Sequence, residues 1–567
     1  MRIDRRTLLG TATAAGLTWP LRALAQGASG DALAAQIDAW ARTQVQPGGA
    51  GFALGVWQAG RIVLTRAYGM ADMESARPIT VPTPFHVASV SKQFAAMAIG
   101  LLWSEGKVDL AADIRTYLPW MPDFGTPVRV EHLLHHVSGL RDQWTLAIAE
   151  GLDIRDLLSQ DRMKNLLRNQ RALNFPPGSD YLYCNSGFTL LGEIVAAVSG
   201  QGLPAFAKAR LFDPIGMTNS HFIRYAGEVI PNRAQSYAKG YQGRPGWEKV
   251  PLNYETWGAT SLSTTVEDLL KWEVELLHPK ILPSALVDRT TQPFTLTDGR
   301  VLHYGFGVMV SDIDGRPAIY HGGSDAGFRT WTGRFPQHDA AIVVLRNDSG
   351  NSTEAAARLV DIYLPAPAAH PKPPKPLPAT DPRAASIVGT WFVEGSELLT
   401  IAQGPSGLLS QPPGGPSQPF IVYDDDTADG GKYRGTFYRI HRDPAGKAVA
   451  LEPTDPSPIV PARDLYAKVA IASPTAQELA DIAGQYRSAE LDTTYRFAVA
   501  NGVLTSTTIR VGEPLKWTPS IRDRFDTIAP HRGMTMQVVR DNGHAIALLL
   551  GLGRSRNLRF DRVSEIA

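Results

Sequence analysis

The 567-residue sequence contains a single cysteine, Cys184, so no disulfide can form within the chain. It also lacks any long run of like charge, and its formal net charge is only +1. Proteins that bind nucleic acid or an acidic membrane surface carry concentrated basic patches, so neither partner is expected. These absences indicate an ordinary globular protein that packing alone must stabilise, and they leave a catalytic role for Cys184 open.

Long hydrophobic runs are also missing, since no stretch approaches the ~20 apolar residues that a membrane-spanning helix needs. The N-terminus has a basic head with the pair Arg5-Arg6, a short apolar run and the pattern Ala23-Leu24-Ala25. This pattern predicts that residues 1–25 are an export signal resembling the twin-arginine type, rather than a membrane anchor. Removing them takes away four arginines and one aspartate and changes the net charge from +1 to −2. We expect a periplasmic or otherwise exported protein without a membrane span after signal removal.

The segment 26–364 mixes helix and strand patterns. A helix pattern over residues 30–44 is followed by alternating apolar residues from 52 to 64, which predict a hairpin. Residues 340–345 predict a buried strand that pairs with the hairpin. Together they indicate an α/β domain in which helices flank an antiparallel sheet. Further helices are predicted over residues 188–198, 266–277 and 352–363.

Beyond this domain, eight prolines in the 18 positions from Pro365 to Pro382 predict an extended linker over residues 365–383. Short alternating runs follow, separated by turn residues, as is typical of all-β modules. A weak repeat relates Ile387-Val388-Gly389-Thr390-Trp391 to residues 482–486, and further matches recur at Arg434 and Arg442. We therefore predict two small β-barrel-like domains, at residues 384–470 and 475–567.

The most informative stretch is Ser89-x-x-Lys92, after which apolar residues recur with helical spacing up to Leu102. Lys92 then lies one helical turn after Ser89, on the same side. A hydroxyl near a helix N-terminus, with an amine beside it, is a candidate acyl-transfer nucleophile. The plain alternative is an N-cap serine with a surface lysine. Ser91 is a weaker candidate because Phe94, not a lysine, stands three residues after it.

Two later segments contain suitable partners. Tyr183 and Asn185 lie in a predicted loop, where a tyrosine transfers protons if cations lower its pKa and an amide positions a lysine. His321-Gly322-Gly323 follows an apolar strand, and the glycines would let a substrate backbone approach as an added strand. The backbone N–H of Ser324 would form an oxyanion hole with that of Ser89. A surface tyrosine and a glycine turn are the alternatives.

In this order, Ser89-x-x-Lys92, Tyr183-x-Asn185 and His321-x-Gly323 resemble the serine β-lactamase and penicillin-binding-protein superfamily, in particular its class C β-lactamase-like branch. The segments 131–140 (EHLLHHVSGL) and 258–264 support this, and the resemblance covers roughly residues 30–365. It implies a β-lactamase/transpeptidase-like fold.

The resemblance also implies roles for these residues. Lys92 activates Ser89, Tyr183 delivers the proton to the leaving group, and Asn185 positions Lys92 and the substrate. His321 would hold the tyrosine hydroxyl or the substrate. No metal or cofactor is implied, and the pair His135-His136 is structural rather than a metal site.

The third motif departs from the usual Lys-Thr-Gly, which removes the cation that holds a substrate carboxylate. Efficient β-lactamase or carboxypeptidase activity is therefore disfavoured, whereas His-x-Gly resembles D-aminopeptidases, which also carry two C-terminal β-barrels. We expect a serine hydrolase acting on a small peptide or amide, with an esterase or a non-catalytic cell-wall-peptide binding module as alternatives. The oligomeric state and the role of the β domains stay open.

Overall fold

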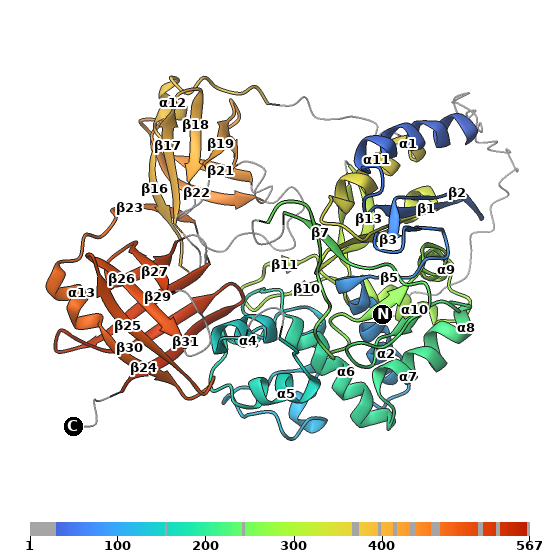
Figure 1. The fold of residues 1–567 in the computed structure, drawn as a ribbon, viewed down its shortest axis with the longest axis horizontal. Coiled ribbons are helices and arrows are strands. Elements are labelled where there is room, and N and C mark those ends of the chain that lie inside the picture. Colours follow the sequence, from blue (N-terminus) through green and yellow to red (C-terminus); the bar gives the residue numbers. More distant parts are fainter. Residues whose placement is uncertain are drawn as a thin grey trace, which may run out of the picture.

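The computed structural model describes residues 30–563, apart from 153–155, 241–243, 314, 366–373, 395–397, 412–416, 431–436, 455–464, 509–513 and 529–532. The predicted export signal and part of the proline-rich segment lie outside the described residues. Figure 1 shows an α/β domain followed by two β-barrels, which confirms the predicted fold class.

The α/β domain is built on a six-stranded antiparallel sheet with the order β12-β13-β14-β15-β1-β2. The predicted hairpin pairs with the late strand, with Val56 opposite Ile342, so the sheet joins the two ends of the domain. Its strands are β12 (Met309–Ile313), β13 (Arg316–Asp325), β14 (Phe328–Phe335), β15 (Ala340–Arg346), β1 (Phe52–Gln58) and β2 (Arg61–Tyr68).

Helices cover both faces of this sheet. Strand alternation sends Leu54 towards α1 (Gly30–Gln44) and α11 (Ser352–Tyr363), which lie side by side in Figure 1. Ala53 points to the opposite face, against α9 (Val266–Leu277) and the rest of the main core. Because both faces are covered, every residue of β15 is buried.

The helix after Ser89 is α2 (Lys92–Ser104), which packs against α6 (Asn185–Ser199). The helical spacing of its apolar residues is typical of a helix with one buried face. Instead, every residue from Lys92 to Leu102 is buried, because other elements enclose the helix on all sides. The polar residues Lys92 and Gln93 are therefore buried as well, and each needs a hydrogen-bonding partner. Tyr183 lies in a loop, as predicted, but Asn185 does not, because it is the first residue of α6.

The two C-terminal units are closed eight-stranded barrels, each preceded by a short helix, α12 (Pro382–Ala385) or α13 (Ala476–Ile482). The repeat is visible in matching contacts: Trp391 Nε1 donates to Ile387 O (2.8 Å), and Tyr486 Oη donates to Ile482 O (2.9 Å). The repeat match at Arg434 lies outside the described residues, and the domain boundaries stay a prediction. The first barrel comprises β16 (Gly389–Phe392), β17 (Leu399–Gly404), β18 (Gly407–Gln411), β19 (Gln418–Val422), β20 (Thr427–Asp429), β21 (Phe437–Arg442), β22 (Ala448–Thr454) and β23 (Tyr466–Val469). The second comprises β24 (Gly484–Ser488), β25 (Thr493–Ala500), β26 (Val503–Thr508), β27 (Leu515–Pro519), β28 (Arg524–Thr527), β29 (Met534–Asp541), β30 (His544–Leu552) and β31 (Ser555–Arg562).

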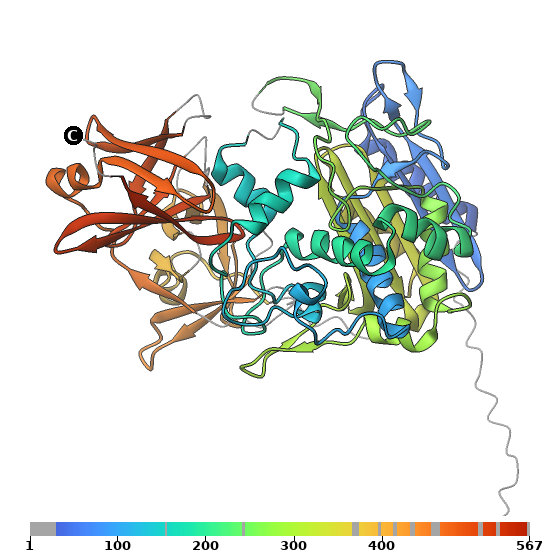
Figure 2. The same cartoon turned by 90° about the horizontal axis from the view of Figure 1, so that it is seen from below.

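Figure 2 shows the second barrel against α4 (Gln143–Glu150) of the α/β domain. Tyr495 of β25 donates a hydrogen bond to Ala149 O of α4 (2.9 Å), so the two domains are in direct contact. Within the described ranges, no single helix has the length and apolar character to cross a membrane. Residues 185–199 and 203–215, bent by 78°, pass that test only as a pair.

Candidate active site

Ser89 lies in η1 (Ala88–Ser91), a short 3-10 turn directly before α2. Ala88 has a positive φ of 50°, a conformation that costs a non-glycine residue about 1–3 kcal/mol and is concentrated at functional sites. Ser89 is partly exposed at the wall of a cleft of about 1280 Å³. The strained turn therefore presents the hydroxyl to an open space that a substrate can enter.

Lys92 is fully buried, and its Nζ lies 3.1 Å from Ser89 Oγ, 2.9 Å from Asn185 Oδ1 and 2.8 Å from Ala259 O. Burial, helped by the charge of Arg554, lowers the pKa of Lys92 to about 7. A neutral amine has two N–H groups, which satisfy Asn185 and Ala259, so its lone pair faces the Ser89 hydroxyl. This is the geometry of a general base.

A buried carboxylate that the sequence did not indicate fixes the orientation of Asn185. Asp142 Oδ2 accepts hydrogen bonds from Asn185 Nδ2 (2.9 Å) and from its backbone N–H (2.7 Å). The other oxygen, Oδ1, caps α4 by accepting from Trp144 N (3.0 Å). Because Asp142 holds the Nδ2 group, the amide of Asn185 cannot turn its N–H groups towards Lys92. Its Oδ1 atom is therefore held against Lys92 Nζ.

Tyr183 completes the reactive group, because its side chain is hydrogen-bonded to Ser89 and its ring centroid lies 4.8 Å from Lys92 Nζ. We expected nearby cations to lower its pKa. Burial instead raises the pKa of Tyr183, and it outweighs the Ser89 hydrogen bond and the charge of Arg554. The phenol is therefore protonated in the free protein and suited to donating a proton, while Lys92 is the group that accepts one.

His321 contacts a different tyrosine from the one expected. Its Nε2 lies 3.0 Å from the hydroxyl of Tyr304, and its Nδ1 lies 2.5 Å from Gly322 O. Tyr304 Oη is also 3.2 Å from His136 Nε2, while His136 Nδ1 accepts from Cys184 N (3.0 Å). These contacts form a chain of hydrogen bonds between uncharged groups. Cys184 N–H donates to His136, His136 to Tyr304, Tyr304 to His321 and His321 to Gly322 O, so every donor has an acceptor.

Burial and the charge of Lys92 lower the pKa of His321 to about 3, and burial also lowers that of His136. The third motif therefore contributes no cation to the cleft. Through Tyr304 and His136 it links the Tyr183 segment to β13. In the described part of the chain, no group of three or more His, Cys, Asp or Glu side chains is placed to hold a metal.

Gly323 and Ser324 lie on β13 beyond its pairing with β12, which ends at Tyr320. The edge from residue 321 to 325 faces the cleft, so a substrate backbone has room there. A side chain at Gly323 would meet Val87 O at 2.3 Å, which explains the glycine. The oxyanion role of Ser324 N–H stays a prediction.

The other candidate nucleophiles are not placed for chemistry. Ser91 is buried, and its Oγ accepts from Leu262 N (3.0 Å). Cys184 is also buried, and burial raises the pKa of its thiol to about 12, so little reactive thiolate forms near neutral pH.

The family model described as Beta-lactamase matches residues 34–364, which is more than half of the chain. The chain belongs to the β-lactamase family. A D-aminopeptidase from Brucella ovis is 30% identical over 327 residues, a match that covers 57% of this chain but only 61% of that relative. A D-aminopeptidase from Cereibacter sphaeroides is 27% identical over 552 residues, covering 94% of this chain and 99% of that protein.

Among solved structures, the octameric penicillin-binding protein homologue from Pyrococcus abyssi aligns with a TM-score of 0.51 at 17% identity, covering 94% of this chain and 98% of its own. At that identity the likeness concerns the fold alone. It extends over both barrels as well as the β-lactamase domain.

Proposed function

We propose that this member of the β-lactamase family is a serine hydrolase that cleaves an amide of a D-amino-acid-containing peptide, as an aminopeptidase. The decisive observation is the Lys92 amine, which lies 3.1 Å from Ser89 Oγ and has a pKa of about 7. A lysine with an ordinary pKa near 10.4 would be protonated at neutral pH and unable to act as a base. The D-aminopeptidase relatives support the substrate class.

The proton path follows from the contacts. Neutral Lys92 takes the proton of Ser89, and Oγ attacks the substrate carbonyl. The oxyanion is held by the N–H groups of Ser89 and Ser324. Tyr183 gives its proton to the leaving nitrogen as the C–N bond breaks, and Lys92 returns a proton to Tyr183. Water, deprotonated by the same pair, then attacks the acyl-serine ester. The C–Oγ bond breaks, the pair returns the proton to Ser89 Oγ, and the acid is released.

An aminopeptidase must also bind the α-ammonium group of its substrate, and Asp325 is placed for this. The carboxylate lines the cleft with 25% of its side chain exposed. Burial raises its pKa, but the hydrogen bond and charge of His86, with the hydroxyls of Tyr254 and Thr260, outweigh burial and lower it. Asp325 is therefore an anion at the end of the unpaired β13 edge.

The test compares D-alanine p-nitroanilide, its L counterpart, p-nitrophenyl butyrate and nitrocefin as substrates. We expect turnover of the D-anilide, with kcat/KM rising as pH increases through about 7, where Lys92 loses its proton. Ser89→Ala should abolish turnover and labelling by a fluorophosphonate. Asp325→Asn should raise KM for the D-anilide but not for the uncharged butyrate ester. Turnover of the ester alone would indicate an esterase, and no labelling of the wild type would indicate a binding module.

We also propose that the chain is exported, on the strength of Arg5-Arg6 and the Ala23-Leu24-Ala25 pattern. Expression of the full chain in a Gram-negative host should yield a periplasmic protein that begins at Gln26 on N-terminal sequencing. Replacing both arginines by lysine should retain the precursor in the cytoplasm. An unprocessed wild type would contradict this proposal.

A further inference from the structure

The turn between β30 and β31 of the second barrel reaches into the α/β domain. The side-chain amide of Asn174 makes two hydrogen bonds to the backbone of this turn. Its Nδ2 donates to Arg554 O (3.0 Å), and its Oδ1 accepts from Arg556 N (2.8 Å). Thr145 of α4 and Ser555 join through their hydroxyls (2.5 Å). The backbone around Arg554 is therefore fixed by side chains of the domain that holds Ser89.

The whole barrel is anchored next to this turn. Arg141 and Glu490 form an ion pair in which both side chains are buried. The same guanidinium donates to Arg556 O (3.1 Å) and Asn557 O (3.0 Å) of β31. Because Arg141 is buried at the domain junction and makes several hydrogen bonds, it fixes the orientation of the second barrel relative to the α/β domain. The position of Arg554 relative to the cleft is fixed in the same way.

The Arg554 side chain faces the reactive group. Its guanidinium carbon lies 4.7 Å from the centroid of the Tyr183 ring, and the residue lines the cleft with 43% of its side chain exposed. Its nearest carboxylate oxygen is Asp142 Oδ2 at 3.9 Å, which already accepts two hydrogen bonds from Asn185. Among the described residues, none accepts a hydrogen bond from this guanidinium at normal distance.

Arg554 thus supplies a positive charge to a cleft whose third motif has none. We propose that Arg554 binds a carboxylate on the leaving-group side of the substrate, and that the preferred substrates are short D-aminoacyl peptides with a free C-terminal carboxylate. The leaving-group side follows from Tyr183, since the guanidinium lies over the ring that donates the proton. This inference rests on the proposed function for its substrate class.

The charge of Arg554 gives a second readout, because it helps to lower the pKa of Lys92. Removing this charge should raise the pH at which kcat/KM increases as Lys92 loses its proton, that is, the acid limb of the pH profile. Removing a residue that only packs would leave that pH unchanged. The other titratable groups that act on Lys92 or face it are Asp142, Asp325, Cys184, Tyr183, His136 and His321.

The experiment uses the full chain with D-alanyl-glycine and D-alanyl-glycinamide, which differ in the carboxylate alone. The variants are Arg554→Gln, Arg554→Lys and, as a matched control on β31, the exposed Arg559→Gln. We expect the wild type to prefer the carboxylate peptide by about 10- to 100-fold in kcat/KM, the range of a charge-assisted hydrogen bond. Arg554→Gln should lose this preference through KM and shift the acid limb up, Arg554→Lys should retain part of both, and Arg559→Gln should resemble the wild type.

Equal turnover of the two peptides by the wild type, or an equal loss for both in Arg554→Gln, would overturn the inference but leave the proposed function standing. If neither peptide is cleaved, the proposed function fails on its own. The inference is then decided by protection of Ser89 from fluorophosphonate labelling. The carboxylate peptide should protect the wild type better than the amide does, and the difference should vanish in Arg554→Gln. Equal protection would contradict it.

Discussion

Replacement of Asp142 by asparagine should separate two effects of this carboxylate on the reactive group. It orients Asn185 by accepting two hydrogen bonds, and its charge raises the pKa of Lys92. An asparagine at position 142 whose side-chain oxygen still accepts the hydrogen bond from Trp144 N–H would direct its NH2 group towards Asn185. The two groups of Asn185 that face it, Nδ2 and the backbone N–H, are also donors. The variant therefore loses both bonds and brings donors together.

The size of the effect follows from those bonds. Hydrogen bonds to a charged group contribute about 1.5–3 kcal/mol each, so Asp142→Asn should reduce the free energy of unfolding by at least about 3 kcal/mol. Displacing the Asn185 amide would release one of the three contacts of Lys92 Nζ. Misplacement of a catalytic group by about 1 Å costs roughly 10²-fold in rate, which we expect for kcat/KM. Because an anion that raises the pKa of Lys92 is lost, the acid limb should move below pH 7, opposite in sign to Arg554→Gln.

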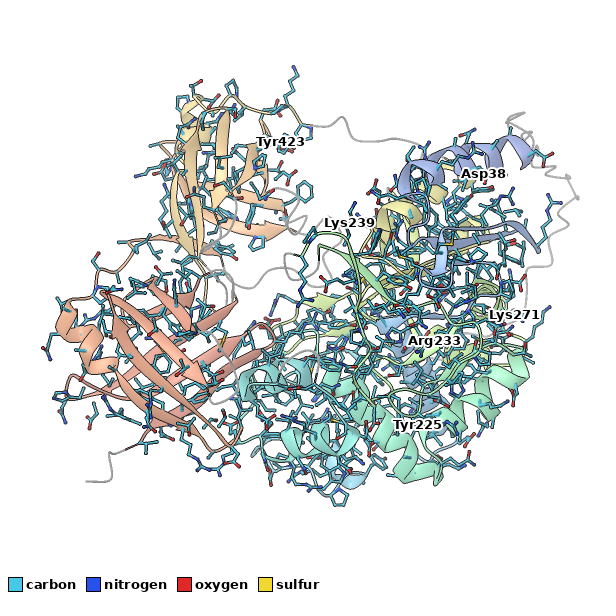
Figure 3. The ribbon with its side chains drawn as sticks, viewed as in Figure 1. Asp38, Tyr225, Arg233, Lys239, Lys271 and Tyr423 are labelled. Carbon is cyan, nitrogen blue, oxygen red and sulfur yellow. The ribbon has the colours of Figure 1, made fainter. Side chains whose placement is uncertain are left out.

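Asp268→Asn is the matched control. Asp268 is buried in α9 and accepts from Asn219 N (2.7 Å), Ser220 Oγ (2.9 Å) and Lys271 Nζ (2.9 Å). In Figure 3, Lys271, which contacts Asp268, lies at the edge of the α/β domain far from the barrels; Tyr423 marks the first barrel for comparison. This variant should lose comparable stability without moving the acid limb.

The assay measures the urea concentration at which activity is lost, together with kcat/KM across pH, for both variants. Equal stability of Asp142→Asn and the wild type, with an unshifted acid limb, would refute the role assigned to this carboxylate. A shift to higher pH would show that the charge acts in the opposite sense.

Two further predictions concern packing. Gly323→Ala places a Cβ 2.3 Å from Val87 O, so the turn before Ser89 must move and kcat/KM should fall by about 10²-fold. Gly30→Ala at the start of α1, where a Cβ meets nothing within 4 Å, should be nearly neutral in the same assay. Arg141→Ala leaves Glu490 buried without its partner, which costs about 3–5 kcal/mol, so limited proteolysis should release the second barrel sooner than in Arg559→Ala. An unchanged proteolysis rate would contradict the anchoring role.

Local patterns were enough to predict several elements. The helices α9 and α11 begin and end where the apolar periodicity placed them, and the hairpin of β1 and β2 pairs with β15 as expected. These predictions succeed because periodicity and turn residues act over a few positions. The closed barrels follow from the same alternation, repeated along the chain.

The sequence by itself brought Ser89 within reach of Lys92, because a three-residue separation in a helical turn fixes that geometry wherever the helix lies. It did not reveal Asp142, Tyr304 or Arg554, since each reaches the site only through folding and the last comes from another domain. Nor did it determine the chemistry of the lysine. Only enclosure of α2 on every side removes water from Lys92, and that desolvation, with a guanidinium from the second barrel, lowers its pKa to about 7.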